Sequence, residues 1–212
     1  MQKTKKLSTK QKIIQTSIEL FNEQGAQNIT SRHIAAKLGI SHGNLDYHYK
    51  TKEALMIAIY EQMRTEMSES YNSRIDFTSS FEHFQRLLKH LDEFNLKYRF
   101  FNLDVLEISR SFPQLSRLLE ETIQLRKKQM EDLFKEFIQE GFIQEKSQKE
   151  YSRLQHHIRI IITFWLPQKE ILSSFQSTET GEMVRHIWAL LTPYFTPEGQ
   201  KEYERVMKDW PV

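Results

Sequence analysis

The apolar residues of this chain recur mainly every three to four positions, which places them on one face of an α-helix. Alternating apolar and polar residues, the pattern of a half-buried strand, never continue for more than a few positions. The chain holds only six glycines and five prolines, so few residues interrupt its helical segments. These patterns predict an all-α protein.

Helix start and stop signals divide the chain into about nine segments. Ser8 with Gln11 has the spacing of a capping box, and Ser79 with Glu82 has the same spacing. Start signals lie at Ser8, Thr30, Ser41, Thr51, Ser79, Tyr98, Pro113, Ser147, Gly181 and Thr196.

Two of the later segments matter for the structure of the chain. We expect one aromatic-rich helix over residues 98–112 and a further helix over residues 181–194. Pro167 has no backbone N–H, so we expect it to break or kink the helix that starts at Ser147.

Residues 30–55, TSRHIAAKLGISHGNLDYHYKTKEAL, combine short helices with a tight turn. Ile34, Ala35 and Leu45 can close a small core. Gly39 supplies the positive φ that a tight turn between helices requires. This pattern is typical of a helix-turn-helix unit, which places its second helix in the major groove of DNA.

The polar side of the second short helix carries groups that suit a DNA groove. His42, Asn44 and Tyr47 can hydrogen-bond or stack there, and Gly43 lets the backbone approach a base edge or phosphate. Lys52 begins the next helix, where free N–H groups, the helix dipole and an ammonium converge on one phosphate.

Residues 10–60 resemble the N-terminal domain of the tetracycline-repressor (TetR) family of bacterial transcriptional regulators. The resemblance extends over the whole helix-turn-helix segment rather than one short motif. The matching residues are Ile13, Ser17, Leu20, Phe21, Gly25, Thr30, Ile34, Ala35, Leu38, Gly39, Ile40, Ser41, Leu45, Tyr47, His48, Tyr49, Lys52, Glu53 and Leu55.

The resemblance implies that the turn after the second helix and the whole third helix enter the major groove. Arg32 stands where some relatives carry an arginine that reads guanine, and Lys52 falls where relatives hold a phosphate. The residues expected to bind DNA are Thr30, Ser31, Arg32, Ser41, His42, Gly43, Asn44, Tyr47, His48, Thr51 and Lys52.

Two residues depart from the family pattern. Ser17 occupies a position that usually holds alanine, and Asp46 stands where many members carry a tyrosine that touches the DNA backbone. Phosphates repel a carboxylate, so we expect that contact to be missing. We expect Asp46 to pair with Lys50 one helical turn later, or alternatively to accept a hydrogen bond from a cytosine amino group.

Charge is distributed unevenly along the chain. Residues 1–60 carry nine Lys and Arg against four Asp and Glu, and residues 61–212 carry 21 against 24. A basic end on a slightly acidic remainder is what a small phosphate-seeking module would show. The lysines at positions 3, 5 and 6 extend this end as a tail that reaches a minor groove or only solubilises the terminus.

Composition excludes several other classes of site. Cysteine is absent, so disulfides, thiolate metal sites and cysteine nucleophiles are excluded. The longest apolar run, residues 160–166, is far shorter than the roughly 20 residues that cross a bilayer. The first ten residues carry charge without an apolar segment behind it, unlike a secretory signal. We therefore expect a cytoplasmic protein that binds no membrane.

Aromatic residues between positions 98 and 112 and at positions 164 and 165 form a candidate effector pocket, because small-molecule sites combine apolar walls with a few polar groups. The alternative is that most of these residues are simply core. The candidate effector-binding residues are Phe101, Phe112, Arg126, His156, Phe164 and Trp165.

A single helix-turn-helix makes few contacts, so we expect a two-fold dimer that spans half-sites about 34–36 Å apart. Residues 158–166 are apolar nearly all round and residues 181–195 carry two apolar stripes, so a partner subunit can cover one face of each. The alternative is that one subunit covers both faces itself. The expected dimer residues are Ile158, Ile162, Met183, Ile187, Leu190 and Tyr194.

The sequence therefore predicts a DNA-binding domain at residues 1–52 and a helical effector-binding and dimerisation domain at residues 53–212. The predicted protein is a repressor that binds a palindromic operator as a homodimer and is released by a small apolar or amphipathic effector. No cofactor, metal ion or catalytic residue is expected. The alternative function is a helical protein–protein interaction adaptor whose basic end binds acidic protein surfaces.

Overall fold

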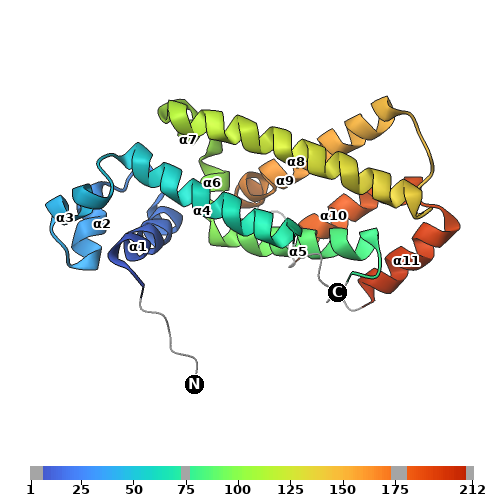
Figure 1. Ribbon diagram of the computed structural model, residues 1–212, viewed down its shortest axis with the longest axis horizontal. Coiled ribbons are helices and arrows are strands. Elements are labelled where there is room, and N and C mark those ends of the chain that lie inside the picture. The colour runs from blue at the N-terminus through green and yellow to red at the C-terminus, as the bar shows by residue number, and fades with distance from the viewer. Residues whose placement is uncertain (1–6, 73–76, 173–180, 209–212) are drawn as a thin grey trace, which may run out of the picture. The chain divides into compact units, whose positions relative to one another are not determined.

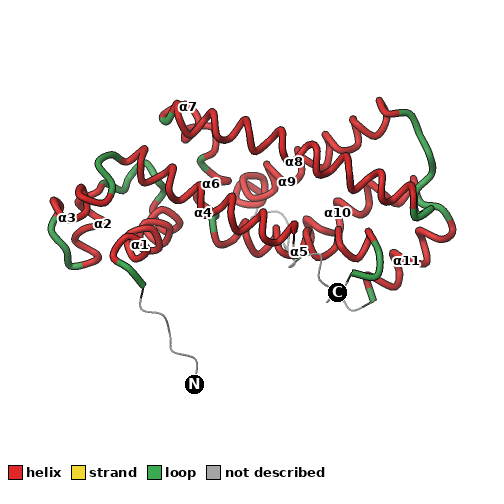
Figure 2. Tube along the Cα trace, in the orientation of Figure 1, coloured by secondary structure: helices red, strands yellow, loops and turns green. Residues whose placement is uncertain are grey.

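The computed structural model describes residues 7–72, 77–172 and 181–208, and these residues are mostly helical (Figure 1). No named strand occurs among them, and loops only connect the helices (Figure 2). One isolated antiparallel bridge joins Ile143 and Phe195. The predicted all-α class is confirmed.

The helices α1 to α11 and one 3-10 turn, η1, follow one another in chain order. They are α1 (Thr9–Gln24), α2 (Ser31–Leu38), α3 (His42–His48), α4 (Lys52–Asn72), α5 (Ser80–Lys97), α6 (Arg99–Leu103), α7 (Val105–Ser111), α8 (Pro113–Gln139), α9 (Gln148–Leu172), α10 (Glu182–Leu191), η1 (Thr192–Tyr194) and α11 (Pro197–Met207).

Capping residues begin the N-terminal helices as predicted. Ser8 and Gln11 form a capping box at α1, and the Ser41 hydroxyl accepts the backbone N–H of Asn44 at 3.1 Å. The Thr51 hydroxyl accepts the N–H of Ala54 at 3.0 Å. These bonds satisfy N–H groups that a helix leaves without an internal acceptor.

The expectation of one helix over residues 98–112 is wrong. Asp104 separates α6 from α7 with a non-helical backbone (φ −105°, ψ 12°). Its carboxylate accepts the backbone N–H of Ala26 at 3.3 Å. Aspartate is a weak helix former because its short side chain bonds backbone groups outside the helix.

Pro167 was expected to break or kink its helix; the break is wrong, because α9 continues through it to Leu172, and the kink stays a prediction. Proline removes one hydrogen bond from the helix, but Trp165 and Leu166 beside it are held in packed positions. Near the C-terminus the opposite happens: α10 stops at Leu191, and a 3-10 turn containing Pro193 replaces the expected last turn of helix.

Contacts between residues divide the chain into two units. Unit 1 is Met1–Glu66 with Tyr98–Glu120, and unit 2 is Met67–Lys97 with Glu121–Val212. Helices α1, α2 and α3 therefore fold together with the start of α4, with α6 and α7, and with the start of α8. The division passes through α4 and α8, so each of these helices continues from one unit into the other.

Unit 1 closes around a small core. The rings of Phe21 on α1 and Phe100 on α6 lie 5.2 Å apart, and those of Tyr60 and Phe101 stack at 5.3 Å. The Asn22 side chain accepts the backbone N–H of Phe100 at 2.9 Å. Segments far apart in the sequence are thus held by both apolar and polar contacts.

Unit 2 has an aromatic core built by α5, α8, α9, α10 and α11. Phe81 packs edge-on against Phe137 at 4.9 Å and against Trp188 at 5.0 Å. The indole N–H of Trp188, which is fully buried, donates to Gln85 at 2.6 Å.

Across all the residues that the structure describes, every helix is too short or too polar to cross a bilayer.

Candidate nucleic-acid interface

The helix-turn-helix segment rests on a well-packed apolar base. Ile34, Ala35 and Leu45 are buried, as the sequence predicts, and so is Phe21 on α1. Gly39 adopts the left-handed conformation (φ 65°, ψ 30°) that reverses the chain between α2 and α3. This base fixes which side of α3 faces outward.

The outward side of α3 consists of His42, Gly43, Asn44 and Tyr47, here called the α3 face. All four residues are exposed, and Tyr47 is 83% exposed. The His48 ring meets the Tyr47 ring edge-on at 5.3 Å. The α3 face is therefore available to a partner outside the chain.

Gly43 stands on the α3 face without a structural need for glycine. A Cβ atom there would meet no heavy atom within 4 Å, and the backbone has no positive φ. By contrast, Gly199 could not carry a side chain, since its Cβ would lie 1.9 Å from the Phe142 carbonyl oxygen. Space at Gly43 matters only to a molecule that approaches from outside.

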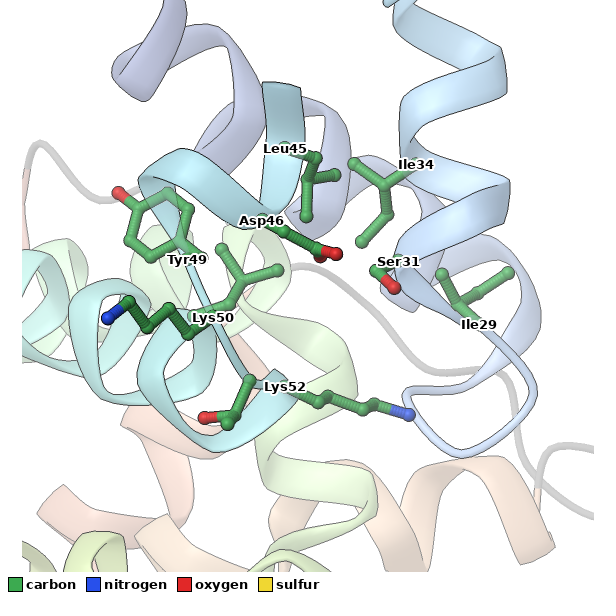
Figure 3. Close-up of a pocket in the computed structure, with 10 residues that line it drawn as sticks. Ile29, Ser31, Ile34, Leu45, Asp46, Tyr49, Lys50 and Lys52 are labelled. Carbon is green, nitrogen blue, oxygen red and sulfur yellow. The ribbon is translucent and has the colours of Figure 1, made fainter. Parts of the chain in front are cut away.

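Three polar side chains form a chain of contacts between α2 and α3. The Ser31 hydroxyl lies 2.8 Å from Nε2 of His42, and Nδ1 of His42 lies 3.3 Å from Oδ2 of Asp46. The expected partner of Asp46 was Lys50; the structure instead pairs it with His42, one turn earlier rather than one turn later. Figure 3 shows the Asp46 carboxylate pointing toward Ser31 across a pocket.

The order Ser31, His42, Asp46 is that of a hydrolase triad, but the setting differs. The carboxylate of such a triad is buried and holds the imidazole in place. Here the side chains of His42 and Asp46 are each 43% exposed, and Ser31 lies in the first turn of a short helix. Their contacts orient groups on a surface rather than activate a nucleophile.

Lys52 was expected to hold a phosphate, but its ammonium is used within the protein. It donates to the backbone carbonyl of Ala26 and lies 5.9 Å above the ring of Phe21. Burial lowers the pKa of Lys52 from its ordinary value. In Figure 3 its side chain extends toward the turn between α1 and α2. Lys52 therefore holds that turn against the start of α4.

Ala26 is bound on both of its backbone groups. Its N–H donates to Asp104, and its carbonyl accepts from Lys52. A further bond joins the Glu53 carboxylate to the N–H of Gln114 at 3.0 Å. These contacts could not be predicted from the sequence, because they join residues 26 to 78 positions apart.

The remaining predicted DNA-binding residues lie around the α3 face at the surface. Each has a polar group that is exposed or partly exposed. They are Thr30, Ser31 and Arg32 at the start of α2, Ser41 before α3, His48 at its end, and Thr51 before α4. Lys50 is exposed next to Thr51, although it was not among the predicted residues. The lysines at positions 3, 5 and 6 lie outside the described residues.

The predicted effector-binding residues are divided between the two units. Phe101 and Phe112 belong to unit 1, where Phe101 is buried against Tyr60. The others belong to unit 2, and two of these, His156 and Phe164, are exposed on α9. Neither His156 nor Phe164 is part of the buried core of unit 2, and their role in effector binding stays a prediction.

Buried polar side chains in unit 2 were missed by the sequence reasoning. Gln85 and Asn95 on α5 and Gln155 on α9 are each at most 6% exposed. The Nε2 atoms of Gln85 and His90 are buried without a hydrogen-bond partner within the described part of the chain. These residues could have been found in the sequence as polar positions on otherwise apolar helix faces.

Half of the predicted dimer residues face the interior of their own subunit rather than its surface. Ile158, Met183 and Ile187 are completely buried in the core of unit 2, so their side chains cannot reach a partner subunit. Ile162, Leu190 and Tyr194 are partly buried against the same core. The alternative that one subunit covers these stripes holds for the first three residues.

Two family models match the chain. One, described as a bacterial transcriptional repressor, matches residues 62–203, and one for bacterial regulatory proteins of the tetR family matches residues 13–59. The tetracycline repressor protein class C of Escherichia coli is 40% identical over 53 residues, which are 25% of this chain. That match spans 24% of the repressor's own length.

Solved structures resemble the chain over most of its length. A TetR-family transcriptional regulator from Marinobacter aquaeolei VT8 is 29% identical, with a TM-score of 0.84, covering 95% of this chain and 97% of that one. A protein from Saccharomonospora viridis, described as a transcriptional regulator and solved in complex with choline, is 16% identical with a TM-score of 0.70. That likeness covers 86% of this chain and 95% of the other.

Proposed function

Because the chain belongs to the TetR family of bacterial transcriptional regulators, we propose that it is a repressor that binds a palindromic DNA operator as a homodimer. In this proposal a small apolar or amphipathic effector binds unit 2 and releases the DNA. The observation that carries it is the α3 face, an exposed row of polar groups on a short helix whose other side is fixed in a core.

The α3 face supports major-groove reading. Asn44 and Tyr47 can contact base edges, and Gly43 leaves room for the backbone to approach DNA. Arg32 is exposed on α2, where its guanidinium can form two parallel bonds to guanine. Beside the groove, phosphates are bound by Lys50, Thr51 and His48. Lys50 takes the role that was expected of Lys52.

The dimer is proposed to form through one stripe of α9. Ile160 and Phe164 are each 45% exposed and Ile171 is 74% exposed. At 100° per residue these three side chains fall within about 40° of one another on the helix. Ile158 lies on the opposite side of α9 and is completely buried. An apolar stripe left open by its own subunit suits a two-fold contact with a second copy.

The effector site is proposed to lie in the interior of unit 2. Gln85, which accepts a hydrogen bond from Trp188 in the aromatic core, and His90 each bring a buried nitrogen atom that no described protein group satisfies. Such atoms cost free energy unless a ligand or water bonds them. The choline complex of the Saccharomonospora viridis protein offers a fold-level precedent for a ligand in this fold. Arg126 and Trp165 remain candidates for the same site.

Release is proposed to proceed through α4 and α8, since each continues from unit 2 into unit 1. An effector that favours one packing of unit 2 changes the position of these helices, and operator and effector then oppose each other reciprocally.

DNA binding is tested by selecting ligands of the purified chain from a random pool of duplexes. We expect a palindromic consensus, with affinity falling steeply as salt rises because phosphate contacts release counterions. Arg32→Ala is expected to relax base preference at one position, whereas Lys50→Ala weakens all sequences alike. An adaptor that binds acidic proteins would enrich no sequence, and that outcome would overturn the proposal.

Dimerisation is tested separately by sedimentation velocity. Ile160→Glu combined with Phe164→Glu is expected to convert the dimer to a monomer, since two carboxylates cannot be buried in an apolar contact. Gln139→Glu, on exposed surface at the end of α8, is the matched control. A double variant that stays dimeric would place the interface elsewhere.

A further inference from the structure

We propose that Asp46 is a base-reading residue that selects a cytosine in each half-site, and that His42 positions it rather than reading a base itself. The inference rests on the proposed DNA-binding function and assigns a base to one residue of the site. It is carried by the contacts that join Ser31, His42 and Asp46.

The hydrogen positions follow from the chemistry of the three groups. An ionised carboxylate only accepts hydrogen bonds, so the ring nitrogen that faces Asp46, Nδ1 of His42, carries the proton. In the neutral ring Nε2 then has only a lone pair, and it accepts the hydroxyl proton of Ser31 at 2.8 Å. Both ring nitrogens of His42 are thus engaged within the protein.

This arrangement changes which side chain can read a base. His42 was expected to contact DNA, but a ring with both nitrogens occupied presents no free donor or acceptor in its plane. Asp46 has two carboxylate oxygens with about four acceptor sites, and His42 occupies one of them. The side chain is 43% exposed on α3, so acceptor sites remain open to the outside.

An acceptor-only group discriminates among the four bases in the major groove. Cytosine presents an amino group there, whereas guanine and thymine present acceptor oxygens that a carboxylate repels. Adenine presents an amino group beside its N7 acceptor, so it satisfies a carboxylate less well than cytosine. The expected order is therefore cytosine, then adenine, with guanine and thymine excluded by repulsion.

His42 restricts the carboxylate to one place. The two residues are four apart on α3, so they share one side of the helix, and Ser31 ties the ring to the start of α2. A freely rotating aspartate would lose side-chain entropy when it bound a base, and that loss would weaken its contact with cytosine. His42 is therefore a positioning residue, and Asp46 is the residue that touches the base.

The test begins with duplexes selected from a random pool by the full-length wild-type chain. Each base of the selected half-site is then replaced in turn, and Kd is measured for the wild type and for Asp46→Asn, Asp46→Ala and Glu19→Gln. We expect one cytosine whose replacement by thymine weakens wild-type binding about tenfold or more. Asp46→Ala is expected to reduce that ratio to about twofold or less. Asp46→Asn is expected to shift the preference to adenine, because an amide offers both a donor and an acceptor.

Glu19→Gln is the matched control, since it removes one carboxylate from an exposed position on α1. It is expected to strengthen binding to all sequences slightly and to change no base preference. The role of His42 is tested by a double-mutant cycle. His42→Ala is expected to reduce the cytosine preference of the wild type about threefold and to have no effect on preference in the Asp46→Ala background.

The two proposals fail in different ways. If the wild type enriches no sequence, DNA recognition itself is wrong and the assignment of Asp46 falls with it. If the wild type enriches an operator and Asp46→Asn and Asp46→Ala keep the same base preferences, only the assignment of Asp46 is overturned. If His42→Ala alters preference equally in both backgrounds, His42 reads a base directly and its positioning role is overturned.

Discussion

The two units of this chain hold their helices together by different means. Unit 1 fixes its turns with side chains that bond backbone groups, as Lys52 and Asp104 do at Ala26. Unit 2 depends on interlocking aromatic rings around Trp188 and Phe81. Directional bonds define the angle of an exposed helix, which a surface that reads DNA requires. Apolar packing is non-directional and instead stabilises unit 2 through the area that it removes from water.

The largest expected effect comes from removing the centre of the aromatic core. Trp188→Ala deletes a completely buried ring and leaves Gln85 without its indole donor. We expect it to lower the free energy of unfolding by about 3–5 kcal/mol. Urea denaturation followed by circular dichroism measures this. Leu96→Ala, at a side chain that is 57% exposed on α5, serves as control and should change it by about 0.5 kcal/mol or less.

Lys52 and Lys50 provide the sharpest contrast within unit 1. Lys52→Ala leaves the carbonyl of Ala26 without its donor, so we expect a loss of about 1–3 kcal/mol in stability. Lys50→Ala should leave stability unchanged, because the side chain is exposed. It should also reduce the slope of log affinity against log salt concentration by about one, the amount expected for one lost phosphate contact. Denaturation and salt titration together separate the two roles. Equal effects of both variants on stability would contradict the contrast.

Polar contacts also occur at the edge of unit 2, and these respond to pH. Hydrogen bonds from Thr78, Arg205 and Arg86 lower the pKa of Glu82 to about 2. A lowered carboxyl pKa adds stability that is complete above the unfolded value near 4.5 and disappears as pH falls toward 2. Because the pair Glu82–Arg205 is partly solvated, we expect about 1 kcal/mol.

The measurement compares urea unfolding of the wild type and Glu82→Gln between pH 6 and pH 2. The difference in stability should be largest at pH 6 and close to zero at pH 2. A difference that does not change with pH would show that the carboxylate charge of Glu82 has no part in the stability of this edge.

The smallest effect is expected at Gly43, where stability and binding should change in opposite directions. Gly43→Ala meets no neighbouring atom and adds a better helix former to α3, so we expect a gain of about 0.5–1 kcal/mol in stability. The added methyl group should reduce operator affinity, because it occupies the surface that DNA approaches. Thermal unfolding and a binding isotherm check both signs. Unchanged affinity would remove Gly43 from the interface.

Much of unit 1 was predictable from local sequence. Ser8, Thr30, Ser41 and Gly39 act within a few residues of their own positions, so their residue types indicate where α1, α2 and α3 begin and end. The outward side of α3 follows from the burial of Leu45, the apolar residue of this helix that the sequence pattern assigned to the core. The partner of Asp46 was not predictable, because helix spacing allows a pair one turn earlier or one turn later and only the placement of Ser31 and His42 distinguishes them.

The faces of the later helices were less predictable. Apolar residues surround much of α9 and α10, so periodicity alone does not show which stripe faces the core. The structure buries Ile158, Met183 and Ile187 and leaves Ile160 and Phe164 exposed.

By itself the sequence determined the helical class, the turn geometry of the N-terminal module and the identity of its exposed polar groups, because these depend on contacts within one or two helical turns. Only the tertiary structure decided that Lys52 serves the protein's own backbone, that Asp104 divides an aromatic segment, and which stripe of α9 stays open. Those outcomes depend on groups brought together from distant parts of the chain, and neither spacing nor composition specifies such meetings.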